Sequence, residues 1–182
     1  MEAPSLERSL KILEGTEVSI EGSVVTIKGP LGSISKDFGH ARVSISKREG
    51  EVVVTTDARG RAGKSILGTI TKHVENMMLG TTKGFQCKMK IIHSHFPITL
   101  KVVGDRIQIR NFMGERAPRE AKLEDRNIKV EIQGDDVALK GIDLEKVMQT
   151  AANLENATRI LGKDQRIYLD GIYIVESGYQ VE

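Results

Sequence analysis

The chain has 182 residues and a net charge of +2, and hydrophobic residues make up 39% of it. This composition excludes wholesale disorder and predicts one large or two small globular domains. Because there are only 3 Tyr, 4 Phe and no Trp, the cores are expected to be aliphatic. The single cysteine, Cys87, excludes an internal disulfide and fits a reducing compartment. Residues 1–4 lack the layout of a secretory signal, and no stretch is apolar enough to span a membrane, so we expect a cytoplasmic protein with no membrane partner.

Two segments with alternating apolar and polar residues match each other along the chain. Residues 18–32 lie over residues 100–114, so that Gly22 falls on Gly104. An alternation of period two indicates half-buried antiparallel strands, and glycine at the reversal fits the tight turn of a β-hairpin. The match therefore predicts one hairpin in each half and an origin by duplication.

A second hairpin and a helix follow in each half. Residues 43–54 and 128–139 alternate around a glycine, which again indicates paired strands. Apolar residues then recur at helical spacing, from Ile66 to Met78 with Gly80 as the expected C-terminal cap. They recur again from Leu144 to Leu154, with Asp143 as the expected N-terminal cap.

These elements predict an α+β fold of two tandem duplicated domains, residues 1–82 and 83–182. Each domain is expected to be a small antiparallel sheet packed against one long helix, because both elements have one apolar face to bury.

The segment Gly60–Ser65 resembles a phosphate-binding loop, since it follows a predicted strand and begins a helix. However, only two residues separate its glycines, and Ala58 stands where the first glycine is required. The neighbouring strands are also antiparallel by pattern, whereas the nucleotide fold needs a parallel unit. We therefore interpret the segment as a glycine-rich start of a helix. Its cations Arg59, Arg61 and Lys64 stay candidates for contact with a phosphate of a larger partner.

Cys87, His93 and His95 could together supply three zinc ligands, but the sequence offers no fourth ligand and no typical spacing. We expect Cys87 to pack as a small apolar residue and the histidines to lie at a polar surface. No order of nucleophile, base and acid is visible either. The sequence thus predicts no catalytic residue, no metal, no cofactor and no small-molecule substrate.

Basic and hydrogen-bonding side chains concentrate in glycine-containing loops of the second half. Residues 83–122 hold nine basic and three acidic residues, whereas residues 123–158 hold four basic and eight acidic ones. Guanidinium groups bind phosphate bidentately, and amides read sugar hydroxyls or base edges. Such loops suit a binder of folded RNA, but for a protein of net charge +2 they are equally consistent with ordinary solvated charges. The residues concerned are Arg106, Arg110, Asn111, Arg116, Arg119, Lys122, Lys163, Gln165, Arg166 and Tyr168.

Five segments form a specific ordered set: IKGPLG at 27–32, NMMLGTTKGF at 76–85, HFPI at 95–98, IRNFMGE at 109–115 and DGIYI at 170–174. Through them the chain resembles the universal family of large-subunit ribosomal protein six, in its archaeal and eukaryotic form. The resemblance implies a non-enzymatic protein that binds large-subunit ribosomal RNA near the sarcin-ricin loop and the base of the lateral stalk. It also implies neighbouring large-subunit ribosomal proteins as partners.

The resemblance implies that the C-terminal domain makes most of the RNA contacts. Its motifs carry over to Arg110, Asn111, Gly114, Glu115, Arg116, Asp170, Gly171 and Tyr173. We add Arg119, Lys122, Lys163 and Arg166 because of their charge, and Tyr168 because it lies beside them.

The alternative function is a protein-interaction module, in which the apolar stripe or a sheet edge of the first domain binds a partner protein. Digestion of a lysate with nuclease before sizing separates the two functions, since only a protein assembly survives the removal of RNA.

Overall fold

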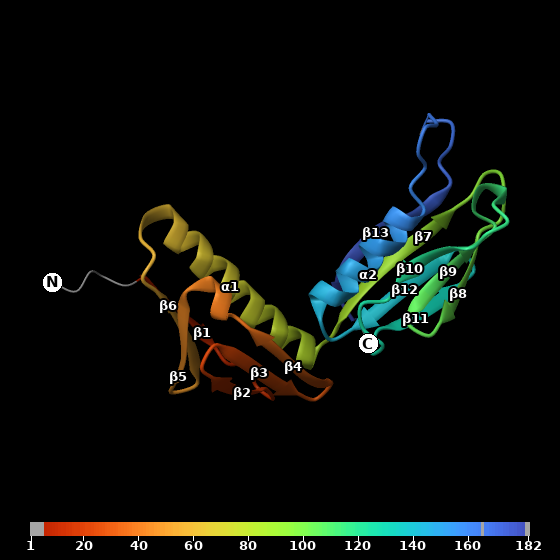
Figure 1. Cartoon of the computed structure of the whole chain (residues 1–182). Coiled ribbons are helices and arrows are strands. Elements are labelled where there is room, and N and C mark those ends of the chain that lie inside the picture. Colours follow the sequence, from red (N-terminus) through yellow and green to blue (C-terminus); the bar gives the residue numbers. More distant parts are fainter. Residues whose placement is uncertain (1–5, 165, 181–182) are drawn as a thin grey trace. The chain divides into compact units, whose positions relative to one another are not determined.

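The computed structural model describes residues 6–164 and 166–180, and the chain folds into two compact units, residues 1–83 and 84–182 (Figure 1). Each unit contains antiparallel strands and one long helix. The prediction of two tandem duplicated α+β domains is therefore confirmed. Neither helix in the described part of the chain is long and apolar enough to cross a membrane.

The first unit contains two three-stranded antiparallel sheets, where the sequence predicted a single sheet. A short 3-10 turn, Gly39–Ala41, separates the sheets in sequence, and Arg42 after it has a left-handed φ of +48°. This change of direction prevents the two predicted hairpins from continuing in one sheet. One sheet has the order β2 (Glu17–Glu21), β3 (Val24–Gly29), β4 (Gly32–Asp37); the other has the order β1 (Leu6–Lys11), β6 (Glu51–Thr56), β5 (Val43–Arg48).

Helix α1 (Gly60–Thr82) covers both sheets, since it contacts β1 and β6 of one and β3 and β4 of the other (Figure 1). Its buried stripe includes Leu67, Val74 and Met78, as the spacing predicted. The expected cap at Gly80 is wrong: this glycine is buried inside the helix, which continues to Thr82. The left-handed position comes after the helix end, at Gly84 with a φ of +71°.

Two glycines of α1 have opposite surroundings and provide a matched test. A Cβ on Gly63 would collide with the backbone carbonyl of Ala58, whereas a Cβ on Gly68 would meet only the tip of Arg8, at 3.8 Å. We expect Gly63→Ala to lower the free energy of unfolding by about 1–3 kcal/mol, through overpacking. Gly68→Ala should raise it by about 0.5–1 kcal/mol, because alanine is the better helix former. Urea unfolding measures both, and stabilisation by Gly63→Ala would contradict the close packing of the helix start.

The second unit repeats this plan and adds one strand. A three-stranded sheet again precedes the helix in sequence, and a larger sheet packs beside it. The first sheet has the order β8 (Thr99–Val103), β9 (Arg106–Arg110), β10 (Arg119–Lys122). The larger sheet has the order β11 (Lys129–Gln133), β12 (Asp136–Gly141), β7 (Phe85–Ile92), β13 (Gly171–Tyr179).

The duplication is visible in the turns. The β2–β3 turn and the β8–β9 turn both have a glycine at their first position, Gly22 with a φ of +63° and Gly104 with a φ of +62°. A two-residue hairpin needs such a conformation, and glycine adopts it without strain. Helix α2 (Leu144–Ala157) contacts strands of both sheets, as α1 does. It begins at the expected cap Asp143, whose carboxylate accepts from the Glu145 and Lys146 backbone N–H groups.

A long connection joins α2 to β13 and extends beyond the end of the helix (Figure 1). It includes the described residues 158–164 and 166–170. The core of this unit is made mainly of aliphatic side chains. It also contains the Phe112 ring and Cys87, which is buried as predicted. This core supports the turn after β9, the loop 93–98 and the connection before β13, which hold most of the predicted site residues; Arg106 and Lys122 pair with each other at the opposite end of β9 and β10.

Candidate nucleic-acid interface

The loop between β7 and β8, residues 93–98, supports the turn that follows β9. The side-chain amide of Asn111 donates to the backbone carbonyl of Pro97 at 3.1 Å. The Phe96 ring lies so close to Gly114 that a Cβ on this glycine would be 3.2 Å from it. Gly114 also has a φ of +75°. Any other residue there would be strained both by this backbone conformation and by contact of its Cβ with the Phe96 ring. The glycine thus lets the turn pack on the loop.

The same loop binds the segment before β13 on its other side. Asp170, whose side chain is only 2% exposed, accepts from the backbone N–H of Ser94, and its Oδ2 lies 2.7 Å from the His95 Nδ1. Burial acts to raise the pKa of the Asp170 carboxyl, but these hydrogen bonds outweigh it and lower that pKa. The His95 ring also stacks on Tyr168, with 5.2 Å between the ring centroids. Two loops distant in sequence are therefore fixed to each other.

The turn after β9 presents its cations on a strained but well-supported backbone. Asn111 and Met113 both have left-handed φ values, +60° and +51°, which asparagine tolerates better than methionine. Phe112 lies between them and is buried in the core. Arg110 and Arg116, on either side of the turn, are exposed. The anchored turn thus holds two guanidinium groups toward the solvent.

Arg119 is directed inward, in contrast to these arginines. Its guanidinium donates to the Glu115 carboxylate at 2.5 and 2.8 Å and to the backbone carbonyl of Ala157 at 2.9 Å. It also lies 4.3 Å above the centroid of the Phe112 ring. The hydrogen bonds from Arg119 lower the pKa of the Glu115 carboxyl. Arg119 and Glu115 therefore hold the turn against the end of α2.

The other predicted cations lie at the margins of this surface. The Arg166 side chain is 90% exposed and forms two hydrogen bonds with Asp164, which lower the pKa of the Asp164 carboxyl. Lys163 lies over the Tyr168 ring, with its Nζ 4.6 Å from the centroid. Lys122 is further away, at the end of β10, and pairs with Glu124 at 3.0 Å. Gln165 lies outside the described residues.

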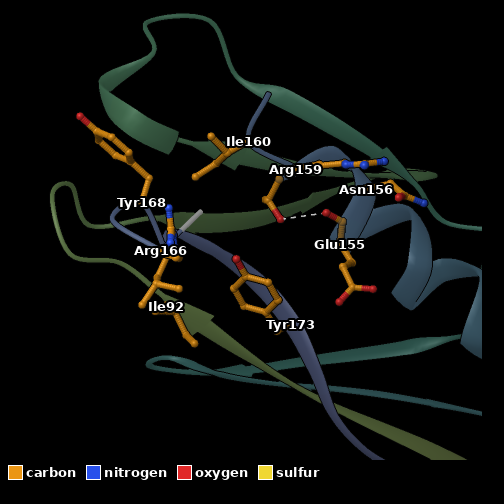
Figure 2. A pocket seen from close by; sticks show the side chains of 10 residues that line it. Ile92, Glu155, Asn156, Arg159, Ile160, Arg166, Tyr168 and Tyr173 are labelled. Atoms are coloured by element: carbon orange, nitrogen blue, oxygen red, sulfur yellow. Dashed lines mark hydrogen bonds between the residues drawn. The ribbon is translucent and has the colours of Figure 1, made fainter. Parts of the chain in front are cut away.

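An open pocket of about 710 Å³ lies where the connection from α2 meets the start of β13. Arg166, Tyr168 and Tyr173 of the predicted set line it (Figure 2), and Gly171 is the first residue of β13. The remaining lining residues are Ile92, Glu155, Asn156, Thr158, Arg159, Ile160 and Leu169.

The weak zinc candidate is better explained by packing and hydrogen bonding. Cys87 is fully buried between strands, and burial raises the pKa of its thiol, which disfavours the thiolate that a metal requires. The His93 Nε2 lies 3.5 Å from the Asp135 Oδ1, and the His95 Nδ1 lies 2.7 Å from the Asp170 Oδ2. Within residues 6–164 and 166–180 no three ligating side chains converge on a common point.

Several residues that shape this surface were not identified from the sequence. Phe96 and His95 support the two loops, while Asn156 and Arg159 line the pocket. The available signal was the segment HFPI at 95–98, whose aromatic and proline residues fit a constrained loop. Asn156 and Arg159 lie at the helix end, where no sequence pattern distinguishes them from solvated residues.

Comparisons with known proteins agree with this architecture. A family model described as ribosomal protein L6 matches residues 12–84 and 96–171. Large ribosomal subunit protein uL6 of Ignicoccus hospitalis is 49% identical over 166 residues, which cover 88% of this chain and 89% of the relative. The uL6 of Staphylothermus marinus is 44% identical over 179 residues, with 96% of each chain covered. The uL6 of Methanosarcina mazei is 42% identical over 171 residues, which cover 94% of this chain and 97% of the relative.

Proposed function

This chain belongs to the ribosomal protein L6 family, and on that premise we propose that it binds large-subunit ribosomal RNA as a structural constituent of the large ribosomal subunit. The family is structural and non-enzymatic. The protein accordingly acts in the cytoplasm, within the ribosome, with ribosomal RNA and other large-subunit proteins as its partners.

The RNA surface is assigned mainly to the second domain, residues 83–182. One observation carries this assignment: the turn after β9, the loop 93–98 and the segment before β13 are tied into a single surface by Asn111, His95 and Asp170. Its location on the RNA is near the sarcin-ricin loop and the base of the lateral stalk, and the first domain faces neighbouring proteins and other RNA segments.

The residues of this surface fall into three groups, according to the role we assign to their side chains. Exposed cations bind phosphates, aromatic and amide groups contact sugars and bases, and the inward residues keep the loops in shape. Because the loops are held before RNA arrives, binding loses little conformational entropy. The first group is Arg110, Arg116, Lys163 and Arg166, with Lys122 at the margin; the second is Tyr168, Tyr173 and Asn111, whose amide also donates to the Pro97 carbonyl; the third is Gly114, Glu115, Arg119, Asp170 and Gly171.

Alanine variants of Arg110, Arg116 and Arg166 test the phosphate contacts. Each lost contact should reduce the slope of log affinity against log salt by ~0.7–0.9. The measurement is affinity for the cognate ribosomal RNA fragment across a salt series. Lys72→Ala is the control, since Lys72 is an exposed cation on α1 that pairs with Glu75, and its slope should equal that of the wild type. Unchanged affinity and slope in all three arginine variants would remove them from the interface.

A further inference from the structure

We propose that the pocket between the end of α2 and the start of β13 holds one unstacked base of the bound RNA, with Tyr173 as the stacking platform. This inference rests on the proposed function, because it places a specific contact within the same RNA surface. It goes further in naming what the pocket takes: a single nucleotide withdrawn from its neighbours, as opposed to the outer face of an RNA helix.

The structure fixes the Tyr173 ring against the backbone. A Cβ built on Gly171 would be 3.0 Å from the ring atoms of Tyr173, so the ring lies directly on this glycine. Gly171 is buried and pairs with Ile92 of β7, which makes the support rigid. Tyr173 nevertheless keeps 37% of its surface exposed and lines the pocket (Figure 2). One part of the ring is supported and another stays available, as a stacking platform requires.

The other walls suit a nucleobase. Ile92 and Ile160 supply aliphatic surface beside Tyr173, and Ile92 is 40% exposed. Burial of these side chains by a flat aromatic base would remove apolar surface from water. The exposed side-chain amide of Asn156 offers both a donor and an acceptor for a base edge. The pocket thus combines a π-face, apolar walls and a group able to read hydrogen bonds.

The charges at the rim favour RNA over a protein side chain as the occupant. Arg159 and Arg166 both line the pocket together with one acid, Glu155, so cations outnumber acids in the lining. Guanidinium groups beside an aromatic platform match the phosphate and base of one nucleotide. Arg166 is held in place by Asp164, with hydrogen bonds of 3.0 and 3.2 Å from its guanidinium. The pocket is also continuous with the phosphate-binding loops, since Tyr168 both lines it and stacks on His95.

The experiment uses the full chain and a ribosomal RNA fragment that contains the sarcin-ricin loop. Tyrosine fluorescence is measured on titration, since the chain has no Trp and only 3 Tyr. Stacking of a base on Tyr173 should quench part of the emission, and that part should be missing in Tyr173→Phe. Affinity should fall about tenfold in Tyr173→Leu, which removes the ring, and change less than about twofold in Tyr173→Phe, which keeps it. The salt slope should stay unchanged in both variants, because no phosphate contact is lost.

The possible failures are distinct. If the wild-type protein binds the fragment but Tyr173→Leu binds equally well, the base pocket is wrong while the RNA surface stands. Equal losses in Tyr173→Leu and Tyr173→Phe would show that the hydroxyl acts and the ring face does not, which also overturns stacking. If the wild-type protein does not bind the fragment, the proposed RNA site itself fails.

Discussion

Phe112→Ala is expected to lower the free energy of unfolding of the second unit by about 3–5 kcal/mol. The ring is only 1% exposed and belongs to the core of that unit, and the Arg119 guanidinium lies 4.3 Å above it. Its removal leaves a cavity under the turn and takes away the surface on which Arg119 packs. Urea unfolding at several wavelengths of circular dichroism measures the change.

The RNA affinity of Phe112→Ala should fall as well, because the left-handed backbone of the turn loses its anchor. Phe38→Ala is the matched control: Phe38 is also 1% exposed but lies in the first unit. Phe38→Ala should lower the free energy of unfolding by a similar amount. It should leave RNA affinity unchanged at temperatures where the variant is folded. Phe112→Leu, which keeps most of the buried volume, should fall between wild type and Phe112→Ala. If the two alanine variants lost RNA affinity equally, the turn would not be a specific part of the interface.

The hairpins could be predicted because their determinants are local. Alternation of period two and a glycine at the reversal act within a few residues, and both copies, at Gly22 and Gly104, have the predicted turn. The division into sheets could not be predicted in this way. Strand β13 pairs with β7 across some 80 residues of sequence, as in the register of Ile172 with Ile91. Such long-range pairings depend on packing that no single window contains.

The end of α1 shows a similar limit. Gly80 has the residue type of a helix cap, but the helix continues past it to Thr82, and the Lys83 backbone N–H still donates to the Leu79 carbonyl at 2.8 Å. Gly84 provides the left-handed residue instead. Two glycines four positions apart are equally suitable by composition, and they are distinguished by a tertiary contact of the last turn, in which the Leu31 backbone N–H donates to the Thr81 carbonyl at 3.0 Å.

In the candidate site, the sequence indicated which residue types gather in these loops but not how their side chains are oriented. Arg110 and Arg119 are both arginines in basic loops, yet only Arg110 is exposed, whereas Arg119 is bound to Glu115 and to the carbonyl of Ala157. That carbonyl is 38 residues away in sequence. His95 is similarly a candidate metal ligand from the sequence alone, because its partner in the structure, Asp170, lies 75 residues further along the chain.

Asp170→Ala is expected to destabilise the second unit by about 2–4 kcal/mol and to separate the loop 93–98 from the segment before β13. Hydrogen bonds to a charged group contribute more than neutral ones, and a buried donor left without an acceptor adds a further cost. The Ser94 N–H and the His95 ring would both lose their acceptor. RNA affinity should fall along with stability, since the loops that carry Asn111 and Tyr168 would no longer be held together.

The pH dependence of unfolding distinguishes the contribution that the charge of Asp170 makes to stability from the contribution of its size and packing. The pKa of its carboxyl in the fold is below the ordinary value of 3.8. Between the two pKa values the unfolded chain therefore binds more protons, and stability rises with pH. The stabilisation is fully present above about pH 4 and is lost as the pH falls through the folded-state pKa. The difference in unfolding free energy between wild type and Asp170→Asn should thus be largest at neutral pH and shrink below pH 4. Glu176→Gln, at an exposed carboxylate that pairs with Lys88, should follow the wild-type curve closely; a constant gap between wild type and Asp170→Asn from pH 2 to 7 would mean that the charge contributes nothing.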